Sequence, residues 1–284
     1  MKIVDCHTHL GFGGELGLHG QVTDLIRALD DAKIDKAVVL AGMLNDCTTE
    51  RALEEIHPYK DRLAVMGSVS LGPDFTQRED HGVHELWLEQ GRLIDKAKAW
   101  IDSHDIIGMK FYSGYEHFYP HDPHVRPILD LCDKAGIPAL FHCGDLYSKG
   151  SQKGQLRFCH PLELDRLASE MPTLKIVMAH VGNPFLTEAM AVLLSKANVY
   201  ADVSGFVYGT FGLIATGKFI NSLKHVHDFL EDPSKLMFGS DWPIADPKSY
   251  KETTQLACRQ LGLTKEQSDM VMGGNAARVF GLGD

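Results

Sequence analysis

The chain has 284 residues, of which 44% are hydrophobic and 23% are charged, and these values are typical of an ordinary globular protein. With 28 Lys and Arg against 38 Asp and Glu, the net charge is −10, and no basic run offsets this acidic surface. Nucleic acids and anionic membranes are therefore disfavoured as partners, a small-molecule substrate is favoured, and a homo-oligomer is left open.

The expected compartment follows from the cysteines and from the first residues. Six cysteines are scattered without a C-x-x-C pair, and several lie in apolar runs, where a free thiol behaves as a small hydrophobe. Met1-Lys2-Ile3 leads directly into an apolar strand, which leaves no room for a signal peptide, and the sequence has no run of 18 apolar residues. We therefore expect a reduced, cytoplasmic protein without a membrane span.

Short apolar runs alternate with segments of helical spacing along the whole chain. Continuous apolar runs are typical of parallel strands buried on both faces, whereas apolar residues at i, i+3 and i+4 indicate amphipathic helices. The expected strands are residues 3–9, 37–41, 63–69, 106–111, 138–142, 174–180, 199–203 and 235–241. The expected helices are residues 22–33, 48–59, 82–104, 122–135, 161–171, 183–196, 219–230, 248–261 and 264–280.

Capping patterns predict where several of these helices begin or end. Asp122-Pro123 and Asn183-Pro184 each have the pattern of an N-cap residue followed by proline at the first helical position. Gly136 predicts a left-handed cap at the end of one helix. Thr264 and Gln267 have the three-residue spacing of a capping box, which predicts the start of the last helix.

The order of these elements predicts the fold class. Eight strands alternate with helices, and no linker-like composition or low-complexity tract interrupts them. This pattern favours an α/β fold, a (β/α)8 TIM-like barrel, over an open doubly wound sheet. We expect residues 1–284 to form a single domain with additional C-terminal helices.

Titratable residues follow several of the apolar runs directly, at the ends of strands where the active sites of such barrels lie. Side chains in a strand alternate between faces, so His7 and His9 of the His-x-His pattern point the same way and can chelate one divalent ion. The candidates are His7 and His9 after the first strand, Lys110 after the fourth, His142 after the fifth, His180 after the sixth and Asp241 after the eighth.

These residue types point to metal-assisted hydrolysis. Neutral imidazoles and a carboxylate bind a divalent ion, which lowers the pKa of a water molecule towards about 7 and polarises a carbonyl group. Asp241 can bind the metal through one oxygen, take the proton of the water with the other, and later give it to the leaving group. His180 is expected to be either a ligand to a second metal or a donor that orients the attacked group.

Several motifs together carry a family resemblance. His7-Thr8-His9, Phe141-His142-Cys143-Gly144, Ala179-His180-Val181-Gly182 and Phe238-Gly239-Ser240-Asp241-Trp242-Pro243 resemble the signature of the amidohydrolase superfamily, and more narrowly of its "amidohydrolase 2" branch of hydrolases and decarboxylases. Residues 274–280 resemble the terminal helix of that branch. The resemblance implies a TIM-like barrel with His7, His9, His142 and Asp241 around a divalent metal, with zinc as the expected ion, and His180 as a ligand or catalytic residue.

The role of Lys110 stays open between three possibilities. In binuclear relatives a lysine at the end of the fourth strand is carboxylated and bridges two metals, so the resemblance leaves both the number of metal ions and a carboxylated Lys110 open. An unmodified ammonium could instead bind a substrate anion, or it could be structural. Further candidates for substrate contacts lie in the loops after the fourth and fifth strands and at a helix start: Tyr112, Tyr115, Asp145 and His160. The imidazole of His160 could alternatively cap that helix.

The sequence therefore predicts an enzyme, a metal-dependent hydrolase of a C–N or C–O bond in an amide, lactone or ester. The principal alternative is a metal-dependent decarboxylase of a small acidic, aromatic substrate, because the same branch contains both activities. A catalytically dead metal-binding protein is disfavoured by the complete ligand set. A phosphoesterase that also begins with His-x-His is disfavoured because that family carries additional ligands at other strand ends.

Overall fold

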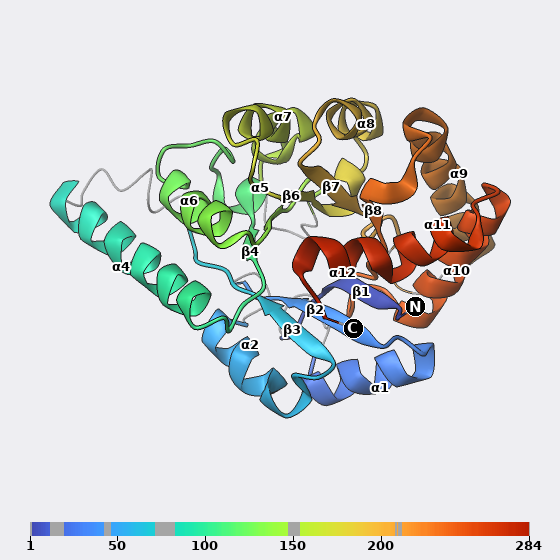
Figure 1. Cartoon of the computed structure of the whole chain (residues 1–284), viewed down its shortest axis with the longest axis horizontal. Coiled ribbons are helices and arrows are strands. Elements are labelled where there is room, and N and C mark those ends of the chain that lie inside the picture. Colours follow the sequence, from blue (N-terminus) through green and yellow to red (C-terminus); the bar gives the residue numbers. More distant parts are fainter. Residues whose placement is uncertain are drawn as a thin grey trace.

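The computed structural model describes residues 2–11, 20–42, 47–71, 83–146, 154–207, 209 and 212–283. Within these residues, short parallel strands lie at the centre and helices surround them (Figure 1). The strands are β1 (Val4–Thr8), β2 (Lys36–Leu40), β3 (Leu63–Met66), β4 (Met109–Phe111), β5 (Ala139–Phe141), β6 (Ile176–Met178), β7 (Val199–Asp202) and β8 (Leu236–Met237). They form two sheets, with the orders β1-β2-β3 and β4-β5-β6-β7-β8.

Backbone contacts at both edges join the two sheets into a ring. Just beyond β3, the carbonyl of Gly67 accepts a hydrogen bond from the amide of Lys110 in β4 at 2.7 Å. On the other side, the carbonyl of Trp242, beyond β8, accepts one from the amide of His9 at 2.7 Å. The described strands therefore follow one another around a parallel ring in chain order, and the predicted (β/α)8 architecture is confirmed.

Most of the described helices cover the outside of the ring of strands, whereas α12 lies at the end where the strands begin. They are α1 (Val22–Ala32), α2 (Thr49–Ile56), α4 (Val83–Asp102), α5 (Ser113–Glu116), α6 (Arg126–Ala135), α7 (Pro161–Glu170), α8 (Leu186–Ser195), α9 (Leu213–Leu230), α10 (Pro247–Gln260), α11 (Lys265–Asp269) and α12 (Asn275–Phe280). No helix in this described part of the chain is long and apolar enough to cross a membrane.

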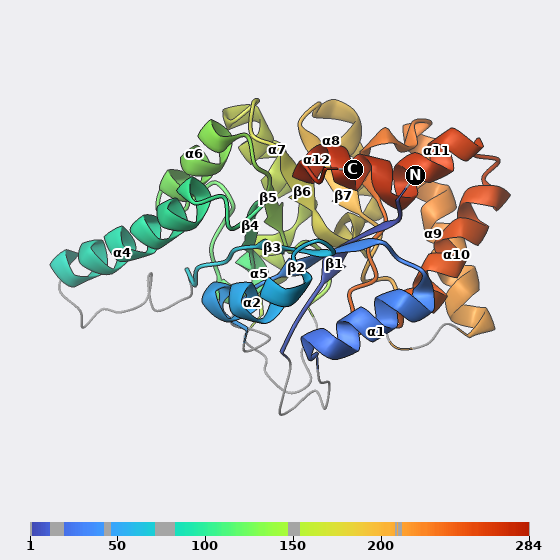
Figure 2. The same cartoon turned by 60° about the horizontal axis from the view of Figure 1, so that its bottom comes forward.

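Apolar side chains are buried in two layers, inside and outside the ring. The outer cluster lies between strands and helices and includes Leu29 of α1 and Val39 of β2. Val38 and Leu40 alternate with Val39 and belong to the inner cluster. Residues of α12 complete that inner cluster, namely Ala276, Val279 and Phe280. Figure 2 shows α12 close to the N-terminus, on the side where β1 begins, so the carboxyl ends of the strands lie on the opposite side.

Two of the predicted helix starts are wrong because the polar residue caps a turn or a loop instead. The Asp122 carboxylate accepts a hydrogen bond from the Tyr119 amide at 2.7 Å, and α6 begins four residues later, at Arg126. Asn183 also lies outside its helix, since α8 begins at Leu186, and its carbonyl accepts from the amide of Asp145 at 2.7 Å. The predicted left-handed cap at Gly136 is confirmed, with φ of 70°.

The C-terminal helix is interrupted, and the eighth strand is shorter than predicted. The capping box of Thr264 and Gln267 is confirmed, but a π-helical segment, η7 (Met270–Gly274), separates α11 from α12. The carbonyl of Val271 in η7 accepts a hydrogen bond from the amide of Phe238 at 2.9 Å. The carbonyl of Phe238 accepts a hydrogen bond from the amide of Cys6 in β1 at 3.0 Å, so β8 ends at Met237 and the following residues turn toward β1.

Candidate metal centre

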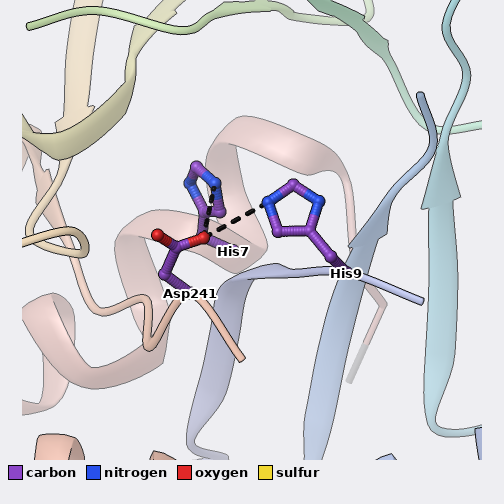
Figure 3. A group of neighbouring side chains, drawn as sticks. All are labelled: His7, His9 and Asp241. Carbon is purple, nitrogen blue, oxygen red and sulfur yellow. Dashed lines mark ion pairs between the residues drawn. The ribbon is translucent and has the colours of Figure 1, made fainter. Parts of the chain in front are cut away.

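Side chains from the two ends of the chain meet at the carboxyl edge of the ring. His9 Nε2 lies 3.2 Å from Asp241 Oδ1, and His7 Nε2 lies 3.5 Å from the same oxygen (Figure 3). All three residues are buried, with relative exposures of 1% for His7 and 5% for both His9 and Asp241. The structure thus brings together three of the predicted metal ligands, although Asp241 is more than 230 residues away from His7 and His9 in the sequence.

The loop after β8 is held against β1 by buried hydrogen bonds. The amide and hydroxyl of Ser240 both donate to the Asp5 carboxylate, at 2.9 and 2.5 Å, and the Asp241 amide donates to the His7 carbonyl at 2.8 Å. Burial raises the pKa of Asp5 to about 7, even though these hydrogen bonds favour its charged form. Asp241 itself has φ of 65°, a left-handed conformation that persists only where the surroundings hold it.

Close approach of the backbone also requires a glycine next to this loop. A Cβ atom at Gly239 would lie 2.8 Å from the Cβ of His7, closer than side chains pack. Burial lowers the pKa of His7 in spite of two neighbouring carboxylates, Asp202 and Asp241, so the imidazole is neutral at neutral pH. Residues 239–241 therefore place the Asp241 carboxylate next to the neutral imidazole of His7.

Hydrogen-bond partners assign the proton positions on these two imidazoles. His9 Nδ1 lies 3.2 Å from the Leu40 carbonyl, and His7 Nδ1 lies 2.9 Å from Asp202 Oδ2. A carbonyl and a carboxylate accept hydrogen bonds, so each Nδ1 carries the proton and each Nε2 is left with a lone pair. Both lone pairs are directed at Asp241 Oδ1, which is itself an acceptor.

Three acceptor atoms facing one another require a positive charge between them. Either a proton or a cation must lie between His9 Nε2 and Asp241 Oδ1, because two lone pairs at 3.2 Å repel. The three ligand atoms lie within 4.8 Å of one another, and two imidazoles with a carboxylate are a donor set that suits zinc and similar divalent ions. The residues present therefore fit a divalent metal.

Asp202, at the end of β7, is a buried site residue that sequence reasoning missed. Its carboxylate accepts from His7 Nδ1 and from the backbone amide of His180 at 3.1 Å. It also accepts from the amide of Ser204 at 3.1 Å and from the Ser204 hydroxyl. The signal was present, because Val199-Tyr200-Ala201-Asp202 ends an apolar run with a carboxylate in the same way as the other strands end with histidine.

Asp202, His7 and His180 form a second group that could hold a cation, since their ligand atoms also lie within 4.8 Å of one another. The hydrogen bonds make this group less suitable. Asp202 already accepts four of them, three at Oδ1 and one, from His7 Nδ1, at Oδ2, so both of its oxygens face hydrogen-bond donors. Burial alone would raise the pKa of Asp202, but His7 and the hydrogen bonds lower it below its usual range. We interpret Asp202 as a carboxylate that orients ligands.

His180 lies in the turn that follows β6, inside η5 (Ala179–Gly182). His180 has a left-handed backbone conformation, with φ of 61°. The centroid of its imidazole lies 4.8 Å from that of the His7 imidazole. His180 Nδ1 lies 2.8 Å from the Ser204 hydroxyl. Burial, followed by the neighbouring His7, lowers the pKa of His180 to about 4, so this imidazole is neutral at neutral pH as well.

His142 follows β5 and lies beside this cluster, with its ring 5.1 Å from that of His180. Its Nε2 lies 2.8 Å from the Asp145 carbonyl, so Nε2 carries the proton and Nδ1 the lone pair. Burial and the neighbouring His180 lower the pKa of His142 well below its usual range. The structure does not place His142 in the three-atom group around Asp241, and its ligand atom would be Nδ1.

Lys110 projects into the ring from β4. It is paired in register with Leu140, and Leu140 belongs to the inner apolar cluster. The side chain is 1% exposed, and its Nζ has no hydrogen-bond partner among the described residues. Burial lowers the pKa of Lys110 to about 8, although Asp202 and Asp241 favour its charged form. An amine that is so buried, unpartnered and easily deprotonated is a candidate functional group.

The four weaker candidates differ in where the structure places them. Tyr112 is buried, and the centroid of its ring lies 4.9 Å from Lys110 Nζ. The Tyr112 hydroxyl donates to the Ala41 carbonyl at 3.0 Å. Tyr115 packs against the His142 ring at 4.9 Å. The Asp145 side chain is exposed and its carboxylate accepts from the Leu146 amide. His160 Nδ1 accepts from the Leu162 amide at 3.3 Å, so this imidazole caps α7, the alternative given for it above.

Comparison with known proteins gives the family. The amidohydrolase family matches residues 4–282. An L-fucono-1,5-lactonase of Burkholderia multivorans is 24% identical over 261 residues, which cover 81% of this chain and 85% of the lactonase.

Two solved structures share the fold over the whole chain. An amidohydrolase from Burkholderia multivorans with bound zinc is 15% identical, with a TM-score of 0.69 and full coverage of both chains. A 2,6-dihydroxybenzoate decarboxylase from Rhizobium is 14% identical, with a TM-score of 0.69 and 99% coverage of both chains. The predicted resemblance and the prediction of an enzyme are confirmed, since the match extends over nearly all of the sequence. The chain belongs to the amidohydrolase family.

Proposed function

We propose that the chain is a metal-dependent hydrolase that opens the ring ester of a small lactone. The observation that carries this proposal is the convergence of His7 Nε2 and His9 Nε2 on Asp241 Oδ1, because this donor set suits a divalent ion next to a carboxylate base. The choice of a lactone is supported by the similarity to the L-fucono-1,5-lactonase. Zinc is the proposed ion, since it is bound in the related amidohydrolase structure.

His7, His9 and Asp241 would hold the ion, with His142 and His180 next to it. When bound, the ion would lower the pKa of a water molecule and polarise the lactone carbonyl. The neutral His180 directs a lone pair from Nε2, because its Nδ1 is bonded to Ser204. We therefore assign His180 the task of accepting a hydrogen bond from the attacking water and orienting it.

Asp241 would move the proton in this reaction. As the water oxygen bonds to the carbonyl carbon, one water proton passes to the Asp241 carboxylate. The ring C–O bond then breaks, and Asp241 returns the proton to the ring oxygen, which becomes a hydroxyl group. The product is an open hydroxy acid that contains all atoms of the lactone and of one water molecule. The hydrogen bond from the Asp241 amide to His7 and the buried Ser240–Asp5 pair keep the carboxylate in place.

We propose that Lys110 contacts a negatively charged or polarised oxygen of the substrate. Its Nζ is buried beside Tyr112 and has no other partner among the described residues. The alternative, a carboxylated Lys110 that bridges two metals, predicts a larger mass, a second metal ion per chain and dependence on bicarbonate. Intact-mass and metal analysis of the same sample distinguish these roles.

A reducing compartment such as the cytoplasm is proposed from the cysteines. All six are buried and free, and burial raises the pKa of Cys6 and Cys143 well above the usual range of a thiol. Neutral buried thiols are compatible with a protein that is never exposed to oxidising conditions.

The proposal is tested by assaying acid release from a panel of 1,5- and 1,4-lactones of sugar acids, including L-fucono-1,5-lactone, in weak buffer with a pH indicator. We expect zinc-loaded protein to hydrolyse at least one 1,5-lactone far above the spontaneous rate, and Asp241→Asn to remain at that rate. Hydrolysis of esters or cyclic amides without any lactone turnover would refute the lactone assignment but keep the hydrolase.

A decarboxylase is the second candidate, favoured by the shared fold with the 2,6-dihydroxybenzoate decarboxylase and by the unpartnered Lys110 amine. Decarboxylation releases carbon dioxide and consumes no net water. Release of carbon dioxide from dihydroxybenzoates, with no acid release from any lactone, amide or ester, would establish this second candidate and exclude the first.

A further inference from the structure

A chain of hydrogen bonds runs from the end of β7 to two of the site histidines. Asp202 Oδ2 accepts from His7 Nδ1 at 2.9 Å. Asp202 Oδ1 accepts from the amides of His180 and Ser204, both at 3.1 Å, and from the Ser204 hydroxyl. That hydroxyl in turn lies 2.8 Å from His180 Nδ1. Asp202 and Ser204 are both 0% exposed, so no bulk water replaces these contacts.

The donor and the acceptor of every hydrogen bond in this network follow from the atoms involved. Asp202 receives four hydrogen bonds, three at Oδ1 and one at Oδ2, and this set of donors favours the ionised carboxylate, which acts as an acceptor only. The single proton of the Ser204 hydroxyl is donated to Asp202. His180 Nδ1 must therefore donate to the Ser204 oxygen, and His7 Nδ1 must donate to Asp202.

Both imidazoles are consequently held in the same tautomer, with the proton on Nδ1 and the lone pair on Nε2. For His7, this lone pair is directed at Asp241 Oδ1, 3.5 Å away. For His180, it is on the ring nitrogen that does not face Ser204. A fixed tautomer matters because an imidazole can bind a metal or accept a proton only through its bare nitrogen.

We propose that Asp202 and Ser204 are positioning residues that set the tautomer and the ring orientation of His7 and His180 together. The chemical role of the two lone pairs rests on the proposed function, whereas their positions follow from the hydrogen bonds of His7 and His180. Because one carboxylate serves both rings, a change at Asp202 affects His7 and His180 at once. A change at Ser204 acts on His180 and leaves the direct bond between Asp202 and His7 in place.

The tautomers can be read directly from the couplings between ring nitrogens and carbon-bound ring protons in long-range ¹⁵N–¹H spectra, in zinc-loaded protein and again after the metal is removed. Signals of His7 and His180 are identified by their loss in His7→Gln and His180→Gln among the 15 histidines. We expect Nδ1–H for both in the wild type. Detection of Nε2–H at His180 in the metal-free wild type would overturn the proposal.

Three variants separate positioning from a merely structural role. Ser204→Ala removes the acceptor of His180, whose nearest carboxylate oxygen is then Asp202 Oδ1 at 3.9 Å. We expect His180 to change tautomer and kcat to fall about 10–100-fold with little change in KM. Ser204→Thr keeps the hydroxyl and should restore both. Asp202→Asn should alter His7 and His180 together and weaken zinc binding about 10–100-fold.

Thr254→Val is the matched control, because Thr254 is also 0% exposed and its hydroxyl donates to the Tyr250 carbonyl, without contact to a site histidine. This variant should leave both tautomers and kcat unchanged. Unaltered tautomers in both Ser204→Ala and Asp202→Asn would refute the positioning role even if their activity fell. Conversely, the expected tautomer changes in a protein that hydrolyses no lactone would support the positioning role while refuting the proposed function.

Discussion

His9 Nε2 and Asp241 Oδ1 face each other at 3.2 Å across a buried gap, and His9 already uses its Nδ1 proton to bond to the Leu40 carbonyl. A neutral imidazole and a carboxylate cannot share this gap without a positive charge between them. A divalent cation bound to both atoms would supply that charge.

Zinc binding is therefore expected to weaken as the pH falls, because ligands must lose their protons before they coordinate a metal. Titration calorimetry at a series of pH values measures the zinc affinity and the number of ions bound. We expect one zinc ion per chain. A zinc affinity that stayed constant from neutral to acidic pH would contradict the assignment of His7, His9 and Asp241 as ligands.

Removal of the metal should abolish activity and lower stability. A ligand that binds the native state alone, at a free concentration of 1,000 times its Kd, contributes about 4 kcal/mol to the free energy of unfolding. For a domain of this size, that corresponds to a rise in Tm of roughly 10 °C. Thermal melts with excess chelator and with added zinc test this, and magnesium at the same concentration is the control, because imidazole is a poor ligand for it.

Asp241→Asn should separate activity from stability. The amide cannot serve as a base, so we expect kcat to fall by at least about 100-fold. In metal-free protein the same change replaces a buried carboxylate, which faces Nε2 of His7 and of His9, by a neutral amide, and removal of a buried charge is often neutral or stabilising. The metal-free variant should be at least as stable as metal-free wild type, whereas with zinc the wild type should be the more stable. Urea unfolding of the four samples measures both comparisons.

The sequence allowed the barrel and most of the site to be predicted because both depend on local patterns. An apolar run that ends in histidine or aspartate is visible in the chain itself, as for His142 and Asp241. In a barrel of eight parallel strands, the residues that follow the strands all lie at the carboxyl edge. The contact between His7 and Asp241 followed from the order of the strands alone, although the two residues lie at opposite ends of the chain.

The features that could not be predicted depend on which ring nitrogen meets which partner. His142 follows its strand as expected, but its Nε2 is bonded to the Asp145 carbonyl of its own loop, and this depends on loop conformation. The sequence places Asp202 in a predicted strand, but its contacts with both His7 and His180 depend on how the neighbouring strands pack. The π-helical segment between α11 and α12 contains Val271, whose carbonyl is bonded to the distant Phe238, and the local sequence pattern does not reveal such a tertiary contact.

Lys110→Met should stabilise the metal-free protein at neutral pH, by an amount that depends on pH. Burial lowers the pKa of Lys110 from an ordinary value of 10.5 to about 8 in the folded protein. Below pH 8 the lysine is charged in both states, so the cost of burying the charge, about 3 kcal/mol, is fully present. Between pH 8 and 10.5 the unfolded chain binds more protons than the folded one, so the stability of the wild type rises relative to the variant.

Unfolding free energies of wild type and Lys110→Met, measured from pH 7 to pH 10 with chelator, should therefore converge as the pH increases. The apolar burial gained by methionine adds an offset that does not depend on pH, so the slope of the difference is the quantity to test. Lys224→Met is the control, because the Lys224 side chain is 59% exposed and should give a difference close to zero throughout. A constant difference for Lys110→Met would contradict the buried, deprotonating amine.

Gly205→Ala should impair the site through His180. Gly205 follows Ser204 with φ of 72°, and a Cβ atom there would lie 2.3 Å from Nδ1 and 2.6 Å from Cγ of the His180 ring. The ring would have to move away from the Ser204 hydroxyl, which it now contacts at 2.8 Å. Because small displacements of a catalytic group are costly, we expect kcat to fall by about 100-fold, measured with the best lactone of the panel.

Gly209→Ala provides a matched control, because this glycine also has a positive φ, 76°, but a Cβ atom there would meet nothing within 4 Å. Both variants carry the strain of a left-handed alanine, about 1 kcal/mol, and Gly205→Ala adds the cost of displacing the buried His180 ring. Only Gly205→Ala should lose most of its activity. If the two variants lost activity equally, backbone strain in the loop after β7 and not the position of His180 would explain the effect. A Gly205→Ala enzyme with wild-type kcat would show that His180 does not need its bond to Ser204 for turnover.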